Sequence, residues 1–366
     1  MDQRQTASLY TLLPSCFPHI FPQSRDGFSV HRLAGDASER RYYRVLFAGN
    51  SSSLVVMQLP EPFTDPETLP FCNVHAHLAA LHLPVPRIVA LHPPSGLLLL
   101  EDLGDVTLEK RLQEADAQTQ ERLYRQAIDL LLTLQIEGSR PRERPCVAFH
   151  LAFDEEKLMW ELDFFLHHAV EQLWQQTISP RDRQRFRQAF LELITPLVAE
   201  KRYFTHRDYH SRNLMVRDDR LAIIDFQDAR MGLCQYDLAS LLRDSYYSLP
   251  PPLFQSLLHY YMEQKALREG KGIAPEHFRY IFDRMAIQRN LKAIGTFAFQ
   301  AVEKGRAAYL RYIPRTVQYV QENIARHPEL SLLGQLLTDY VFAACERFFS
   351  RHDQELIDEH TVVEGE

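Results

Sequence analysis

The sequence lacks several features that would assign it to a special class of protein. No apolar run approaches the roughly 18–20 residues needed to span a bilayer, and Met1–Tyr10 lacks the basic start and apolar stretch of a signal peptide. The 5 cysteines are scattered without CxxC spacing, so neither a disulfide framework nor a zinc site is indicated. Lysine plus arginine number 41 against 48 acidic residues, which argues against affinity for nucleic acid. We expect a cytoplasmic protein that binds neither nucleic acid nor a membrane.

The composition that remains is that of a folded protein. Among 366 residues, 45% are hydrophobic, 24% charged and 11% aromatic, which excludes a disordered, collagenous or coiled-coil chain. The length suits two to three domains or one large enzyme with two lobes.

The first hundred residues alternate between short strand patterns and turn residues. Aromatic and β-branched residues are concentrated in short runs, and glycines lie between them. A longer stretch with helical spacing of apolar residues precedes two further strand patterns. The expected strands are 28–33, 41–47, 54–59, 88–91 and 97–100, with a helix within 66–83. This pattern predicts a small lobe in which five antiparallel strands accompany one helix.

After Leu103-Gly104-Asp105, long amphipathic stretches dominate the chain. We expect helices at 118–136, 154–173 and 180–198, interrupted by a strand-rich segment from Tyr203 to Phe226 with a hairpin around 217–220. The predicted fold class is α+β, with a nucleotide-binding lobe at 1–103 and a mostly helical lobe at 104–366. We place the chemistry in the strand-rich segment.

The densest polar cluster of the chain, Thr205–Asn213, lies directly before an apolar strand. Asp225 ends a second apolar strand twelve residues after Asn213. Asp208, Asn213 and Asp225 are the residue types that phosphoryl transfer needs: a carboxylate to accept the hydroxyl proton, and an amide oxygen and a second carboxylate for Mg²⁺.

At these positions the chain resembles the aminoglycoside phosphotransferases and their protein-kinase-like relatives, which share HxDxxxxN followed by a strand that ends in Ile-Asp-Phe. The resemblance implies that Asp208 is the catalytic base and that Asn213 and Asp225 hold Mg²⁺. It also implies that His206 braces the loop and that Asp237, in the segment Gly232–Ala239, stabilises the loop from the following helix.

The resemblance assigns the nucleotide to the first lobe. Glycine-turn N–H groups would cover the phosphates of ATP, while the Glu101 carbonyl and the Leu103 N–H would read the adenine edge. The turn consists of Gly35, Asp36, Ala37 and Ser38.

The third strand departs from the kinase pattern, because Leu54–Leu59 contains no lysine to pair with phosphate. Another cation must neutralise the phosphates if the protein is active. Arg40, Arg41 and Arg44 lie next to the glycine turn, and arginine clamps phosphate well. Arg41 is the first choice.

A Gly-Asp-Ala-Ser turn followed by arginines, with no strand lysine, resembles one bacterial branch of this superfamily, the anomeric N-acetylmuramate/N-acetylglucosamine kinases of cell-wall recycling. This resemblance implies an enzyme that uses ATP and Mg²⁺ to phosphorylate a sugar at C1. We expect it to be a monomer. For the sugar, aromatic faces would pack on the ring and charged groups would bind hydroxyls or a carboxylate. The candidate acceptor residues are Trp160, Glu161, Phe165, His210, Arg289 and Lys292.

Three other interpretations stay open on the sequence alone. His206, Asp208 and His210 alternate along an extended segment and would face one metal ion. Alternatively, the chain would be a kinase of the same fold whose acceptor is an aminoglycoside or another small alcohol. Without the strand lysine, the chain would be a catalytically dead nucleotide-binding module.

Overall fold

The structure is a computed structural model that describes residues 2–21, 27–33, 40–49 and 52–358. It divides into two compact units. The first, here called the sheet unit, consists of Met1–Ala127, Arg142–Val147 and Arg212–Asp228. The second, the helical unit, consists of Ile128–Pro141, Ala148–Ser211 and Ala229–Glu366. The division into lobes at 1–103 and 104–366 stays a prediction.

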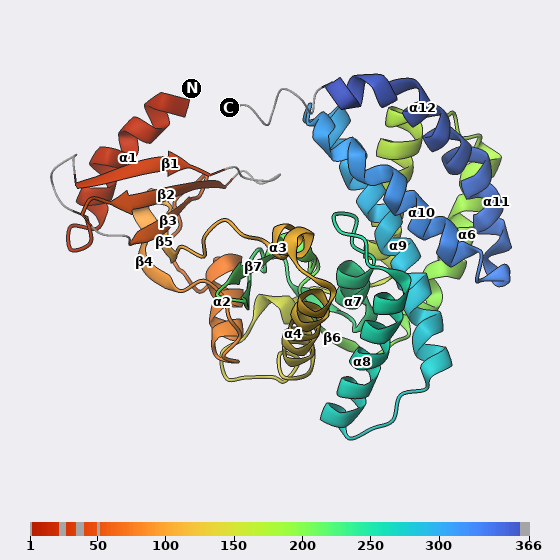
Figure 1. Ribbon diagram of the computed structural model, residues 1–366, viewed down its shortest axis with the longest axis horizontal. Coiled ribbons are helices and arrows are strands. Elements are labelled where there is room, and N and C mark those ends of the chain that lie inside the picture. Colours follow the sequence, from red (N-terminus) through yellow and green to blue (C-terminus); the bar gives the residue numbers. More distant parts are fainter. Residues whose placement is uncertain (1, 22–26, 34–39, 50–51, 359–366) are drawn as a thin grey trace. The chain divides into compact units, whose positions relative to one another are not determined.

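The sheet unit contains one five-stranded antiparallel sheet, with the strands in the order β1-β2-β3-β5-β4 (Figure 1). Its strands are β1 Phe28–Arg32, β2 Arg41–Phe47, β3 Ser53–Gln58, β4 Ile88–His92 and β5 Leu97–Glu101. Each lies within one residue of its expected bounds, and α2 (Pro70–Ala79) lies inside the expected helix. The predicted α+β class and five-stranded sheet are confirmed.

One face of this sheet packs against α1 (Asp2–Cys16), which was not predicted (Figure 1). Pro14 lies inside α1, and a proline in a helical pattern argues against a helix. The shared core is apolar and fully closed. Its buried residues are Leu9, Leu13, Phe17, Phe21, Phe28, Val30, Tyr43, Val45, Val56, Leu97 and Leu99.

The alternation of side chains along β2 decides which residues face α1. Tyr43 and Val45 belong to the α1 core, so Arg41 shares their face, whereas Tyr42 and Arg44 lie on the opposite face. The register agrees, because Tyr42 pairs with Met57 and Tyr43 with Val56 of the same core.

A second sheet element in this unit is the predicted hairpin of β7 (Leu214–Arg217) and β8 (Arg220–Ile223). Its turn residues Asp218 and Asp219 have φ of +50° and +55°. Positive φ at both central residues is the geometry that closes a two-residue hairpin.

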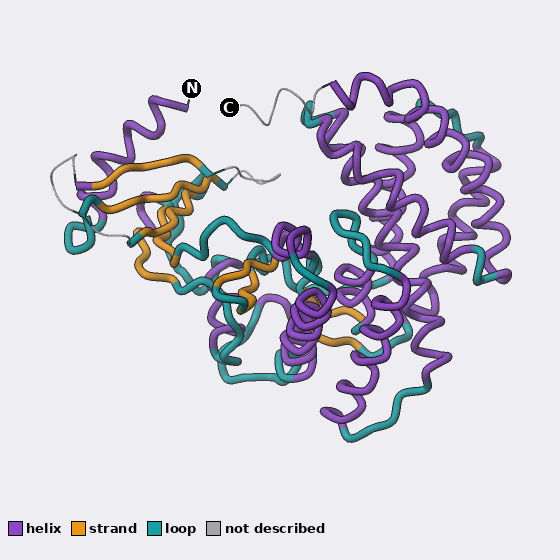
Figure 2. The backbone as a smooth tube through the Cα atoms, viewed as in Figure 1, coloured by secondary structure: helices purple, strands orange, loops and turns teal. Residues whose placement is uncertain are grey.

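The helical unit is built almost entirely of helices, with one strand pair, β6 (Arg202–Thr205) with β9 (Arg230–Leu233), that was not predicted (Figure 2). Among the described residues, the remaining α-helices are α3 Leu108–Glu114, α4 Ala117–Ile136, α5 Glu155–Phe165, α6 Pro180–Val198, α7 Gln235–Leu242, α8 Pro251–Glu269, α9 Pro275–Val302, α10 Ile313–Ile324, α11 Ser331–Leu337 and α12 Ala343–Asp358. None of the helices in the described part of the chain is long and apolar enough to cross a membrane.

Helix α9 is the central element of the helical unit, and α5, α6, α7 and α10 all pack against it. At Gly295 the backbones come unusually close: a Cβ at this position would lie 2.7 Å from the Phe165 Cα at the end of α5. Phe165 is completely buried in the core, so it is not available to pack on an acceptor as expected.

Candidate active site

In the sheet unit, the β7–β8 hairpin brings Asn213 and Asp225 together. The Ile224 N–H donates to the Asn213 carbonyl oxygen at 3.1 Å, and the Asn213 Nδ2 lies 3.4 Å from Asp225 Oδ2. Gln227 Nε2 donates to the other Asp225 oxygen at 2.8 Å. Strand pairing therefore holds the two predicted metal ligands in contact, and the Gln227 amide orients the Asp225 carboxylate.

The backbone of Asp225 is left-handed, with φ of +63°, and its side chain is exposed. A residue with a side chain adopts this region at a cost of order 1–3 kcal/mol, which tertiary structure tolerates mainly at functional sites. The strain is consistent with a carboxylate that is presented for binding.

These residues fit Mg²⁺ by the chemistry of their donors. Mg²⁺ prefers oxygen and commonly takes one or two protein ligands, with water and substrate phosphates completing the shell. Asp225 supplies a carboxylate, and rotation about χ2 of Asn213 would present its amide oxygen. Among the described residues, no three His, Cys, Asp or Glu side chains group as a metal site. This finding also leaves the interpretation of His206, Asp208 and His210 as metal ligands without support.

On the sheet face opposite α1, Met57 stands where the strand lysine was expected, and it is completely buried. Tyr42, which pairs with Met57, has a raised pKa. Burial is the main cause, the nearby Arg40 lowers the pKa, and the charge of Asp225 raises it. Arg40 is therefore close to the Tyr42 hydroxyl. Arg41 is exposed and in phase with the α1 face.

Arg44 of β2 forms ion pairs with two carboxylates in the segment that follows β5. Its guanidinium donates to both carboxylate oxygens of Asp102, at 2.6 and 3.0 Å, and to those of Asp105, at 2.7 and 2.8 Å. The Gly104 N–H donates to the same Asp102 carboxylate at 2.9 Å. Arg44 thus fixes the segment that follows Glu101, the last residue of β5, and this segment contains Leu103.

The glycine turn of Gly35, Asp36, Ala37 and Ser38 lies outside the described residues. Its expected contact with phosphates stays a prediction.

In the helical unit, the loop of His206, Arg207 and Asp208 is held by Asp237. The buried Asp237 carboxylate accepts the backbone N–H of His206 at 2.6 Å and that of Arg207 at 3.0 Å. Burial raises the pKa of Asp237 to about 7, against the effect of these two donors. Arg207 has φ of +86°, so its backbone is left-handed like that of Asp225, and the two hydrogen bonds stabilise that bend. His206 is buried and meets Tyr209 edge to face at 5.7 Å, and the structural roles of Asp237 and His206 stay predictions.

Two cations on α9 converge on the Asp208 carboxylate. Lys292 Nζ donates to Oδ1 at 3.1 Å, and Arg289 Nη1 lies 3.6 Å from the same oxygen. Burial alone would raise the pKa of Asp208, but the charges of Lys292, Arg207 and Arg289 outweigh it and hold the pKa well below its usual range. Asp208 is therefore ionised at neutral pH and is a weak base.

His210 lies beside this carboxylate as a neutral ring, because burial lowers its pKa to about 3. Its ring meets Tyr246 edge to face at 5.0 Å, and its Nδ1 is buried without a hydrogen-bond partner. The structure brings the predicted base, His210 and Arg289 together around one point.

Glu161 belongs to the same interior and has a hydrogen-bonding atom to spare. Its Oε2 accepts from Gln288 Nε2 at 3.0 Å, while Glu161 Oε1, Gln288 Oε1, Arg289 Nη1 and the Tyr236 hydroxyl are buried without hydrogen-bond partners. Native proteins rarely leave such groups unsatisfied. Trp160, by contrast, is 52% exposed.

Sequence reasoning missed the contact of Lys292 with Asp208, and it missed Tyr236 and Gln288 altogether. Gln288, Arg289 and Lys292 recur at spacings of three and four among buried apolar residues of α9 such as Ile287, Leu291 and Ile294. Charged and amide side chains on a buried helical face are uncommon, and this was the available signal.

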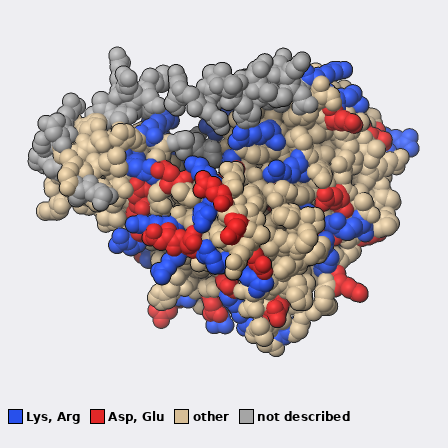
Figure 3. Space-filling view, in the orientation of Figure 1, with Lys and Arg blue, Asp and Glu red and all other residues tan. Residues whose placement is uncertain are grey.

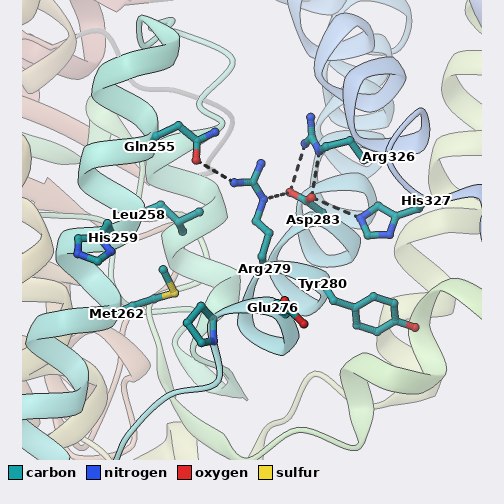
Figure 4. Close-up of a pocket in the computed structure, with 11 residues that line it drawn as sticks. Gln255, Leu258, His259, Met262, Glu276, Arg279, Tyr280, Asp283, Arg326 and His327 are labelled. Atoms are coloured by element: carbon teal, nitrogen blue, oxygen red, sulfur yellow. Dashed lines mark hydrogen bonds and ion pairs between the residues drawn. The ribbon is translucent and has the colours of Figure 1, made fainter.

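A cavity of about 520 Å³ between α8 and α9 contains none of the predicted site residues (Figure 4). At its wall, the buried Asp283 accepts from Arg279 at 2.9 Å and from Arg326 at 3.1 Å, and lies 3.3 Å from His327. These partners compensate the carboxylate within the protein, which indicates a structural ion-pair network. On the face shown in Figure 3, acidic and basic side chains are interspersed.

Comparison with known proteins identifies relatives along most of the chain. The chain is 34% identical to an N-acetylmuramate/N-acetylglucosamine kinase of Pseudomonas aeruginosa over 92% of its own length and 97% of the relative. It is 33% identical to the protein of that name from Pseudomonas putida, over 85% of this chain and 88% of the relative.

Solved structures show the same fold at low identity. A choline kinase from Cryptosporidium parvum Iowa II aligns with a TM-score of 0.59 at 14% identity, over 90% of this chain and 98% of that one. The ADP-bound aminoglycoside phosphotransferase APH(2'')-Ib aligns with a TM-score of 0.55 at 16% identity, over 86% and 97%. The protein-kinase-like fold that the sequence predicted is confirmed. Residues 29–272 match the model of one family, and the chain accordingly belongs to the phosphotransferase enzyme family, APH.

Proposed function

We propose that the chain is an ATP-dependent, Mg²⁺-requiring kinase that phosphorylates the C1 hydroxyl of N-acetylmuramate and N-acetylglucosamine. The observation that carries the proposal is the environment of Asp208. Two cations, at 3.1 and 3.6 Å, make this carboxylate a weak base. A weak base is poorly matched to an ordinary alcohol, whereas the anomeric hydroxyl of a reducing sugar is more acidic and needs less driving force.

In the proposed reaction, the C1 oxygen attacks the γ-phosphorus of ATP while the bond from that phosphorus to the β,γ-bridging oxygen breaks. ADP leaves with the bonding electrons, and the hydroxyl proton passes to Asp208. Asn213 and Asp225 would hold Mg²⁺, which when bound neutralises charge on the β- and γ-phosphates. Asp237 keeps the Asp208 loop in place through the backbone of His206 and Arg207.

For the nucleotide, the proposal keeps Gly35, Asp36, Ala37 and Ser38 as phosphate cover, and the Glu101 carbonyl and Leu103 N–H as adenine contacts. Arg41 stays a candidate for the missing lysine. The register of β2 adds Arg40, which lies beside Tyr42 on the face opposite α1. Arg44 is an unsuitable phosphate clamp because Asp102 and Asp105 already occupy its guanidinium.

Two lines of support favour the sugar over the other small alcohols. Relatives that are 33–34% identical over most of the chain are named N-acetylmuramate/N-acetylglucosamine kinases. In addition, Asp208 is surrounded by positive charge, whereas aminoglycosides and choline are cations that such a charge repels.

The test is turnover of ATP with a panel of sugars and aminoglycosides, followed by phosphorus NMR of the product. We expect turnover with both N-acetylated sugars, a product phosphorus coupled to the anomeric proton, and no reaction with their 1-O-methyl glycosides. Efficient turnover of the methyl glycosides would place the phosphate on another hydroxyl. No turnover of any compound would instead favour a nucleotide-binding module.

A further inference from the structure

Buried polar side chains recur along α7 in the helical unit. Asp237 and Ser240 lie three residues apart on one face of the helix, and Asp244 follows four residues later, just past the last helical residue, Leu242. All three side chains are buried. A buried polar group is costly unless it has a partner, so the partners of these three residues indicate what this part of the chain holds in place.

The first two side chains contact the loop of residues 206–211, here called the Asp208 loop, or a cation beside it. Asp237 accepts two backbone N–H groups at the start of the loop. The Ser240 hydroxyl accepts from Nη2 of Arg289, and Nη1 of the same guanidinium lies 3.6 Å from Asp208 Oδ1. One side chain of α7 thus holds the loop backbone, and the next orients a cation that faces the proposed base.

Asp244 holds the opposite end of the same loop. Its Oδ2 accepts the backbone N–H of Ser211 at 2.9 Å and the Ser211 hydroxyl at 2.5 Å. Its Oδ1 accepts the Tyr246 N–H at 2.8 Å, so the following turn fixes the orientation of the carboxylate. Hydrogen bonds to a carboxylate are roughly twice as strong as those between neutral groups. The loop is therefore held on both sides of Asp208.

The segment that carries Asp244 is itself fixed to the core of the helical unit. Ser245 Oγ lies 2.8 Å from Thr316 Oγ1 on α10, and both residues are buried. The Tyr246 ring meets His210 of the Asp208 loop edge to face at 5.0 Å. Asp244 therefore connects the end of the loop to packed helices through neighbours that are fixed on either side of it.

We propose that Asp244 is a positioning residue for phosphoryl transfer, which acts through Ser211 to hold Asp208 where it takes the hydroxyl proton. The inference rests on the proposed function, in which Asp208 is the base, and deepens it. The Asp208 carboxylate is attracted to Lys292 and Arg289 on α9, so a loop released at one end would let it shift toward them. A misplacement of about 1 Å can cost roughly 10²-fold in rate.

The test is a double-mutant cycle of Asp244→Asn and Ser211→Ala in the full chain. Asparagine has nearly the shape of aspartate but one acceptor oxygen, so it cannot replace both the oxygen that faces Ser211 and the one that faces Tyr246. Alanine removes the Ser211 hydroxyl and leaves the backbone N–H. Steady-state kinetics would measure kcat and the KM values for ATP and the acceptor, and thermal unfolding would measure stability.

In Asp244→Asn, we expect kcat to fall roughly 10²-fold, with both KM values within a few fold of the parent. Ser211→Ala should lower kcat roughly 10-fold, the range of one hydrogen bond to a charged group. The double variant should resemble Asp244→Asn, because two substitutions that break the same contact are not additive. A residue that only stabilised the fold would lower the unfolding temperature without this pattern in kcat.

Asp283→Asn is the matched control, because it makes the same change at a similarly buried carboxylate of the same unit. Asp283 is 2% exposed and Asp244 is 3% exposed, but the partners of Asp283 belong to the ion-pair network beside the cavity between α8 and α9. The control should lower the unfolding temperature and keep the parental kcat.

Two results would overturn the positioning role. One is a kcat of Asp244→Asn within a few fold of the parent, and the other is a pair of losses in kcat that multiply in the double variant. If Asp244→Asn does not fold, Ser211→Ala decides alone: a lower kcat at unchanged KM supports the role, and an unchanged kcat overturns it.

The two proposals fail separately. If the parent accepts neither N-acetylated sugar, the proposed substrate is wrong, and the same cycle is measured on whichever acceptor of the panel, or water, takes the phosphoryl group. If both sugars are phosphorylated and the losses multiply, the positioning role alone is wrong. A parent without any turnover would refute both.

Discussion

The sheet unit and the helical unit present their polar residues in opposite ways. In the sheet unit, Asn213 and Asp225 flank a hairpin and Asp225 is exposed, while the core against α1 is apolar. In the helical unit, Gln288 and Arg289 lie buried in the middle of a 28-residue helix. The first unit holds charge at the ends of strands, and the second surrounds a carboxylate with buried and partly buried cations.

This difference has an electrostatic consequence. Exposed carboxylates are screened by water and salt, and they act as ligands for an incoming cation. Partly buried charges interact strongly with one another, so the properties of Asp208 depend on Lys292 and Arg289 of α9 as well as on Arg207 of its own loop. Substitutions in the two units should therefore affect different measured quantities.

The largest effect is expected at the Asp208 carboxylate itself. Asp208→Asn removes the proton acceptor with little change of shape, so turnover should fall roughly 10²–10⁴-fold while ATP binding is retained. Steady-state kinetics and nucleotide titration measure the two. Turnover within a few fold of the parent would show that another group takes the proton.

The predicted metal ligands in the sheet unit should fail differently. Asp225→Ala should weaken the binding of Mg²⁺ and ATP by at least roughly 10–100-fold. Removing even a residue that only contacts a metal ligand costs this much metal affinity. Turnover measured across Mg²⁺ and ATP concentrations tests this. Asp218→Asn, in the turn of the same hairpin, is the control and should behave as the parent, since asparagine also tolerates a left-handed backbone. Equal behaviour of the two variants would refute the metal assignment.

Lys292→Met should change the pH dependence more than the maximal rate. Lys292 lowers the pKa of Asp208 against burial, which raises it, so loss of the lysine raises the pKa of the base. The rate requires ionised Asp208 and falls as pH falls through that pKa. The acidic limb of the kcat profile should therefore move to higher pH in the variant, and an unmoved limb would mean that Lys292 does not control the base.

The smallest effect is expected on Arg40 and Arg41, at the start of β2. Arg40→Ala should raise KM for ATP or lower turnover by several fold, because Arg40 lies near Tyr42 on the face opposite α1. Arg41→Ala tests the choice made from the sequence and is the matched neighbour. Equal and small changes in both would show that the phosphate-neutralising cation comes from elsewhere.

The sequence predicted more of the site in the sheet unit than in the helical unit. The reason is again where each unit holds its polar residues. Strand ends and loops carry local signals, and Asn213, Asp225 and the hairpin between them were readable from an apolar run followed by a polar residue. The five strands were found because alternation and turn residues are local. Helix α1 was missed because Pro14 weakens its pattern, and the pairing of β6 with β9 because it joins segments far apart in sequence.

The charges around Asp208 could not be predicted from the local sequence pattern. Its partners Arg289 and Lys292 lie more than eighty residues away on α9, and only the packing of helices brings them to the loop. Arg289 and Lys292 were recognised as part of the acceptor region, but their contact with the base was not. Phe165 was taken for an acceptor contact because an aromatic residue on a helix has the same pattern in a core as in a site.

The absence of a side chain at Gly295 sets the separation of α5 and α9, since even one added carbon would lie 2.7 Å from the Phe165 backbone. Of the groups described around Asp208, α5 carries Glu161, and α9 carries Gln288 and Lys292. A larger residue at this position would push the helices apart and move several groups of the proposed acceptor region at once. We therefore expect that substitution of Gly295, in evolution or by design, can change the acceptor preference, although this residue lies in neither the proposed acceptor region nor the catalytic loop.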